Sequence, residues 1–178
     1  MDRSRASGPL AYLITFRTYG TWVHGDARGS VSRRGIRDFG APAIQPHPGR
    51  QVFELGQLRS PPVIFDQVPR MAVAGAISEV CDIRGWTLAA LNVRTNHLHA
   101  VVAANTAPER IMLDFKSYAT RRLRRDGLSR PGSPVWARGG STKYLWQHAH
   151  VAAAIRYATF DQGEDIGGLR TFDETSPC

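Results

Sequence analysis

Residues 86–103 of the chain read WTLAALNVRTNHLHAVVA. Two runs rich in β-forming residues, 86–93 and 97–103, flank a short polar turn at 94–96. Apolar runs of this length, separated by turn residues, are typical of neighbouring strands. The stretch therefore predicts two strands that follow each other directly in the chain.

Helical patterns flank this pair of strands on both sides. Asp66 precedes a segment in which apolar residues recur at helical spacing as far as Gly85. Pro108 and Glu109 open a second such segment, which runs to about Arg125. Proline in the first turn and glycine at the end are typical helix boundaries. We expect one helix before the strand pair and one after it.

Three further elements complete the expected order. Residues 10–16 predict a first strand, residues 143–147 a fourth strand and residues 149–160 a last helix. The order β-α-β-β-α-β, with the extra C-terminal helix, is the ferredoxin-like pattern. The expected fold class is α+β: an antiparallel sheet with helices packed on one face.

Two segments fall outside this order, and neither has helical or strand periodicity. Residues 25–62 are crowded with Gly, Pro and Arg and predict a long basic loop insertion. Residues 161–178 hold five acidic residues and one arginine, and we expect a solvated acidic tail, for which disorder is one expectation. One domain is thus expected over residues 1–160.

The charge balance points to an anionic partner. The chain has 178 residues, with 23 Lys and Arg against 15 Asp and Glu, for a net charge of +8. Only Lys116 and Lys143 are lysines. Arginine grips phosphate bidentately, so an arginine-rich body with an acidic tail favours nucleic acid as the partner.

Several classes of protein are excluded by what the sequence lacks. No apolar run approaches the roughly 20 residues that cross a bilayer, and no apolar segment typical of a signal peptide follows the N-terminus. Cys81 and Cys178 are the only cysteines, and they form no CxxC motif. We expect no membrane partner, no disulfide scaffold and no cysteine-based zinc site, and a cytoplasmic protein, in the bacterial cytosol or nucleoid.

The second strand of the pair carries a His-x-His motif. Strand alternation places His97 and His99 on one face, and Leu98 and Ala100 on the other. Two adjacent imidazoles can share one divalent metal ion. The alternative is that both rings face solvent or donate to neighbouring groups.

The following helix carries a tyrosine among cations. Tyr118 lies at the edge of the apolar stripe, near Lys116, Arg121 and Arg122. One interpretation is an amphipathic core tyrosine. The other is a phenolic nucleophile aimed at a phosphate, activated by a metal ion and by guanidinium groups.

The motif as a whole resembles a known family. Asn96-His97-Leu98-His99, followed by a helical tyrosine behind a lysine, resembles the HUH single-strand nucleases. Within them it is most similar to the single-tyrosine transposases, especially the REP-associated tyrosine transposases. The segments 12–17 and 144–146 resemble two further segments of that family, and the similarity spans roughly residues 9–160.

The resemblance implies a ferredoxin-like fold, an Mg²⁺ or Mn²⁺ ion and cleavage of single-stranded DNA near a hairpin. On that basis His97 and His99 are metal ligands and Tyr118 is the nucleophile, which leaves a 5′-phosphotyrosine and a free 3′-OH for strand transfer. Relatives act as dimers or as monomers, so a homodimer is one expectation. The residues expected to contact the DNA backbone are Arg17, Lys116, Arg121, Arg122 and Lys143.

One position departs from the family pattern. Many relatives place a glutamine one turn after the nucleophile as third metal ligand, and here that position is Arg122. A guanidinium cannot bind a cation. Asp114, Asp26 and His24 remain as alternative third ligands, with Asp114 slightly favoured.

Two other functions are compatible with the sequence. A domesticated DNA-hairpin-binding protein, with weak or no cleavage, would explain Arg122 at the ligand position. A metal-dependent hydrolase would instead activate water with His97, His99 and either Asp26 or His24, and Tyr118 would be structural.

Overall fold

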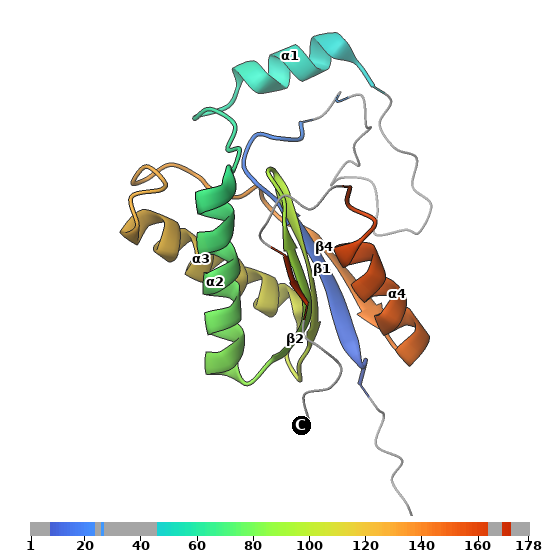
Figure 1. The fold of residues 1–178 in the computed structure, drawn as a ribbon. Helices are drawn as coiled ribbons and strands as arrows, with labels where there is room; N and C mark the ends of the chain where they lie inside the picture. Colours follow the sequence, from blue (N-terminus) through green and yellow to red (C-terminus); the bar gives the residue numbers. More distant parts are fainter. Residues whose placement is uncertain (1–7, 24–25, 27–45, 164–168, 172–178) are drawn as a thin grey trace, which may run out of the picture.

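A computed structural model describes residues 8–23, 26, 46–163 and 169–171, and Figure 1 shows their arrangement. The elements in chain order are β1 (Ala11–Arg17), α1 (Pro48–Gly56), α2 (Gln67–Arg84), β2 (Thr87–Val93), β3 (His97–Ala103), α3 (Pro108–Arg125), β4 (Ser141–Leu145), α4 (His148–Thr159) and β5 (Leu169–Thr171). None of the helices in these residues is both long and apolar enough to cross a membrane.

The described strands form one antiparallel sheet in the order β4-β1-β3-β2-β5. β1 lies between β3 and β4, and its register places Thr15 opposite His99 and Arg17 opposite His97. On the other side of β3, Asn92 of β2 is the partner of His99. The predicted β-α-β-β-α-β order and the α+β class are confirmed.

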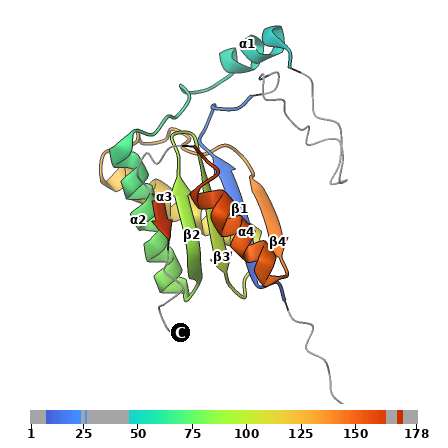
Figure 2. The same ribbon diagram turned by 45° about the vertical axis from the view of Figure 1, so that its right-hand side comes forward.

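Helices cover both faces of the sheet. α2 and α3 pack on one face, and α4 lies on the other (Figures 1 and 2). The larger core joins Leu98 and Ala100 of β3 to Ile77 of α2 and Phe115 of α3. The smaller core lies between the sheet and α4 and includes Val101 of β3. The two predicted helices therefore share one face, and the extra C-terminal helix covers the opposite one.

Local sequence explains where the helices end. α2 stops at Gly85, whose φ of 66° is a left-handed conformation that glycine adopts without a steric penalty. α3 begins with Pro108 in its first turn and ends before Gly127, which has a φ of 70°. The helices predicted from Asp66 to Gly85 and from Pro108 to about Arg125 are confirmed.

Two predictions of irregular structure are wrong in part. Within residues 25–62, His47 caps α1 by accepting a hydrogen bond from the Arg50 backbone N–H. Hydrophobic periodicity does not predict α1, because this helix buries none of its residues and lies away from the sheet (Figure 1). Within 161–178, β5 pairs with β2, and a strand this short has no periodicity to detect. Residues 27–45, 164–168 and 172–178 lie outside the described part of the chain.

Candidate active site

His97 and His99 lie side by side at the start of β3. Their neighbours Leu98 and Ala100 belong to the larger core, so both imidazoles face the α4 side, as the alternation predicts. The ring centroids are 4.9 Å apart, and the ring planes are inclined by 81°. His99 is only 4% exposed, whereas His97 is partly exposed.

A polar neighbour contacts the Nδ1 atom of each ring. The Asn96 side-chain oxygen lies 2.6 Å from His97 Nδ1, and the Thr15 hydroxyl lies 2.8 Å from His99 Nδ1. A ring that donates through Nδ1 keeps a lone pair on Nε2 for a metal ion. His99 Nε2 is buried and has no hydrogen-bond partner among the described residues. An unpartnered buried nitrogen beside a second imidazole fits a divalent metal site.

Burial keeps His99 neutral. It lowers the pKa of His99 to about 4, with further lowering by the neighbouring His97 and by the charges of Arg17 and Arg94. The Gln162 side chain opposes this shift. Because only a neutral imidazole binds metal, His99 is in the ligand form at neutral pH.

Tyr157 of α4 lies against the His99 imidazole. The two ring centroids are 5.2 Å apart, in an edge-to-face arrangement with 78° between the planes. Tyr157 is 41% exposed. Its ring therefore reaches the surface while it also contacts the buried imidazole. Gln162, just beyond α4, donates from its amide nitrogen to the Tyr157 carbonyl at 3.1 Å. The end of α4 thus brings a phenol and an amide to the two histidines.

Cations surround this group of side chains. Arg17 is the β1 partner of His97, and its guanidinium carbon lies 3.1 Å from the ring centroid of Trp22. Arg94 contributes its charge at His99 and approaches Gly163. Lys143 is the partner of Leu13, whose side chain packs in the smaller core, so it extends from the same face of the sheet. Two of the predicted DNA contacts, Arg17 and Lys143, therefore lie on the face that carries the histidines.

The prediction that Tyr118 joins the histidines is wrong. Tyr118 lies on α3, packs against the larger core and is partly buried beneath the Arg121 guanidinium, 4.2 Å from its ring centroid. The sheet separates this core from the imidazoles. Tyr118 is the amphipathic core tyrosine of the alternative interpretation.

Of the predicted third ligands, the structure describes Asp114 and Asp26, and neither joins the histidines. Asp114 is on α3, on the wrong face, and pairs with Arg84 at 3.1 Å and with Arg110 at 3.3 Å. Asp26 is buried, but within the described ranges no three His, Cys, Asp or Glu side chains gather closely enough to hold a metal. His24 lies outside the described residues.

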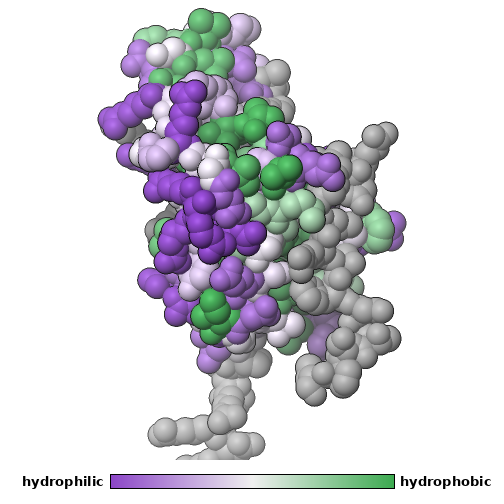
Figure 3. Space-filling model, turned by 60° about the vertical axis from the view of Figure 1, so that its left-hand side comes forward, coloured by the Kyte–Doolittle hydropathy of each residue, from purple (hydrophilic) through white to green (hydrophobic). Residues whose placement is uncertain are grey.

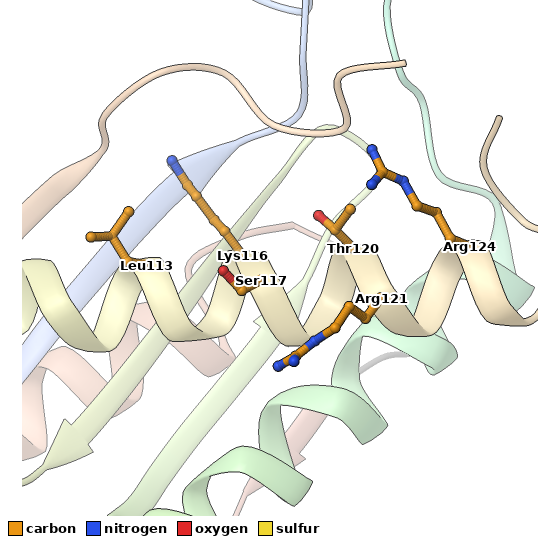
Figure 4. Close-up of a pocket in the computed structure, with 6 residues that line it drawn as sticks. All are labelled: Leu113, Lys116, Ser117, Thr120, Arg121 and Arg124. Atoms are coloured by element: carbon orange, nitrogen blue, oxygen red, sulfur yellow. The ribbon is translucent and has the colours of Figure 1, made fainter. Parts of the chain in front are cut away.

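The remaining predicted DNA contacts lie on α3. Lys116 donates to the carbonyls of Ala137 and Gly139 and so anchors the loop before β4. Arg122 pairs with Asp126 on its own helix. Arg121 and Arg124 line a hollow of about 500 Å³ with Lys116, Ser117, Thr120 and Leu113 (Figure 4). Figure 3 shows hydrophilic side chains gathered over this side of the molecule.

The sequence does not predict that Tyr157 and Gln162 lie beside the histidines, because the resemblance points to a tyrosine on the helix that directly follows them. Strand alternation says that two residues share a face but not which helix covers it. One sequence pattern does point to this pair. Gln162 follows Tyr157 by five residues, whereas the position one helical turn after Tyr118 is Arg122 and not a glutamine.

Two solved structures are similar: a protein from Deinococcus radiodurans R1 described as a candidate transposase, and a REP-associated tyrosine transposase bound to a REP hairpin. The first has 14% identity and a TM-score of 0.47, and the match covers 86% of this chain and 92% of that one. The second has 12% identity and a TM-score of 0.45, with 89% and 70% covered.

Sequence comparison is the stronger finding. No curated protein matches the chain. The profile of the IS200-like transposases matches residues 61–162, which include both histidines, Tyr157 and Gln162. Because this match covers more than half of the chain, the protein belongs to the IS200-like transposase family.

Proposed function

We propose that this transposase is a metal-dependent endonuclease and strand transferase acting on single-stranded DNA, with Tyr157 as its nucleophile. The observation that carries the proposal is the edge-to-face contact of Tyr157 with His99, at 5.2 Å between centroids, beside an unpartnered Nε2. The resemblance noted from the sequence supports a hairpin-containing strand as substrate. The expected domain of residues 1–160 must then extend at least to Gln162, which the proposal uses as a ligand.

His97, His99 and Gln162 are the proposed ligands of Mg²⁺ or Mn²⁺. His99 offers its unpartnered Nε2, and the His97 imidazole lies beside it. The Gln162 amide oxygen remains when its nitrogen donates to the Tyr157 carbonyl. A bound ion would polarise the scissile phosphate and stabilise its developing negative charge. With Gln162 in this role, Arg122 need not be a ligand.

Tyr157 carries the covalent step. Its oxygen bonds to phosphorus as the bond from phosphorus to the 3′ oxygen of the preceding nucleotide breaks. The phenol gives up its proton to solvent, and the 3′ oxygen takes one up. The products are a 5′-phosphotyrosine and a free 3′-OH. Attack by the 3′-OH of another strand reverses the step and joins the strands without ATP.

Arg17, Arg94 and Lys143 supply positive charge at this face. Arg17 and Arg94 both affect the His99 imidazole electrostatically, so they lie within range of a phosphate held beside it. Guanidinium groups bind phosphate oxygens with two parallel hydrogen bonds. We assign these residues the role of holding the strand while Tyr157 attacks.

Neither alternative function is favoured by a specific observation. The hairpin-binding protein without cleavage was motivated by Arg122, which instead pairs with Asp126 far from the histidines along α3. The water-activating hydrolase needs a third ligand such as Asp26, and no such trio gathers among the residues that the structure describes.

The test compares two tyrosine variants. Wild-type protein, Tyr157→Phe and Tyr118→Phe are incubated with Mn²⁺ and hairpin oligonucleotides that have randomised single-stranded flanks, labelled at the 5′ or the 3′ end. We expect a covalent adduct that retains the 3′ label in the wild type and in Tyr118→Phe, and none in Tyr157→Phe. Cleavage without an adduct in Tyr157→Phe would select the hydrolase. Hairpin binding without cleavage by the wild type would select the binding protein.

A further inference from the structure

We propose that Asn92 is a positioning residue that fixes the Tyr157 end of α4 against the histidine strand. The inference rests on the proposed function, because it concerns the placement of the proposed nucleophile. Asn92 does not touch the reacting atoms in this scheme and acts through the backbone of α4.

Asn92 is a buried polar residue in β2, whose other polar residue, Thr87, is exposed at the start of the strand. Asn92 is 4% exposed, and its register partner on β3 is His99. Directly opposite residues of antiparallel strands have their side chains on the same face. Asn92 therefore lies beside His99, on the face that α4 covers.

The Asn92 amide is bonded to α4 one residue after Tyr157. Its Nδ2 donates to the Ala158 carbonyl at 2.8 Å. The carbonyls of the last helical turn lack partners within the helix, so this one is satisfied from the sheet. A buried bond of this kind costs more when its donor is removed than its net contribution suggests, because the carbonyl stays buried without a partner.

Asn92 thereby links the two parts of the proposed site. The imidazole and Tyr157 come from elements that are distant in sequence, and Asn92 is adjacent to the first and bonded beside the second. Ala158 itself is fully buried in the smaller core, so the carbonyl that accepts this bond is at a tightly packed point. A 1 Å displacement of a nucleophile can lower a rate about 100-fold, and a link of this kind limits such displacement.

A merely structural role predicts a different result. Loss of a buried hydrogen bond elsewhere in α4 would lower the melting temperature without slowing the covalent step. Thr159 offers that control, because its hydroxyl donates to the Ile155 carbonyl within the same helix at 2.8 Å and does not join α4 to the sheet.

The experiment compares Asn92→Leu with Thr159→Val in single-turnover reactions with Mn²⁺ and the cleavable hairpin oligonucleotide. We expect the adduct-forming rate at saturating DNA to fall about 10- to 100-fold in Asn92→Leu and less than about 2-fold in Thr159→Val. The oligonucleotide Kd, measured by fluorescence anisotropy, should stay unchanged in both. Should Asn92→Leu fail to fold, Asn92→Val removes the same donor with a side chain suited to a strand, and the same loss is expected.

Two outcomes separate this inference from the proposed function. An unchanged rate in the Asn92 variant, with the adduct still on Tyr157, would overturn the positioning role alone. A wild-type protein that cleaves without an adduct would overturn the proposed nucleophile and the role of Asn92 with it.

Discussion

At the residue scale, His99 is a titratable group in an environment very different from that of an exposed side chain. It combines a buried imidazole with an Nε2 that has no partner in the described structure. A protein retains such a costly arrangement where the free nitrogen has a use. The lowered pKa then has a consequence for stability as well as for metal binding.

We expect His99 to make the metal-free protein less stable in acid. Its pKa is about 4 in the folded protein and about 6.5 when unfolded. Between these values the unfolded chain binds the proton and the folded protein does not, so stability is full above pH 6.5 and falls as the pH drops toward 4. The loss is about 3 kcal/mol. Urea unfolding from pH 7 to pH 4 in EDTA, compared with His99→Gln, measures it; parallel pH profiles for the two proteins would contradict the assignment.

Individual residues also show which features of the candidate site the sequence predicts and which it does not. Alternation in β3 correctly predicts that His97 and His99 share a face, because strand geometry fixes that relation locally. The sequence does not distinguish Tyr118 from Tyr157 as the tyrosine beside the histidines, because both lie on helices and local pattern does not tell which sheet face each helix covers. Gln162 becomes a candidate only through its contact with Tyr157, which the fold places beside His99.

At the scale of elements, packing of β4 against β1 depends on the close approach of a glycine. A Cβ added to Gly140 would lie 2.6 Å from both the Thr15 carbonyl oxygen and the Met112 sulfur. Thr15 also supports His99 through its hydroxyl. The start of β4 therefore fits only where residue 140 has no side chain.

We expect Gly140→Ala to destabilise the protein by about 2 kcal/mol, as overpacking of a tight contact does. Gly56→Ala is the control, because a Cβ there would meet no atom within 4 Å. Thermal or chemical unfolding of the two variants measures the difference. Equal stabilities of the two variants would show that Thr15 of β1 and Met112 of α3 shift readily to make room for the added Cβ.

Elements were the part of the fold most accessible from sequence. The boundaries of α2 and α3 follow from Pro108, Gly85 and Gly127 together with long periodic runs, and those of β3 follow from its apolar run. These predictions are confirmed. α1 and β5 were not foreseen, since one buries no side chain and the other gains its order from pairing with β2. Both depend on contacts or caps that hydrophobic periodicity does not encode.

At the scale of the whole molecule, the sheet separates two cationic regions. One surrounds the histidines and includes Arg17 and Arg94. The other is the hollow along α3, which holds Arg121 and Arg124 (Figure 4). A DNA strand that contacts both must pass around an edge of the sheet. The region along α3 would then add to the affinity for DNA, and the proposed covalent step would take place at the histidines.

We expect Arg121→Ala combined with Arg124→Ala to weaken DNA binding without slowing the covalent step at saturating DNA. Two lost phosphate contacts should make the slope of log K against log salt concentration less steep by about 1.4 for a single strand. Anisotropy titrations over a range of NaCl concentrations measure that slope, and single-turnover adduct formation measures the step. Arg50→Ala combined with Arg59→Ala lowers the charge equally on other segments and should change the slope much less. If both double variants change it to the same extent, the α3 hollow acts only through net charge and is not a DNA contact surface.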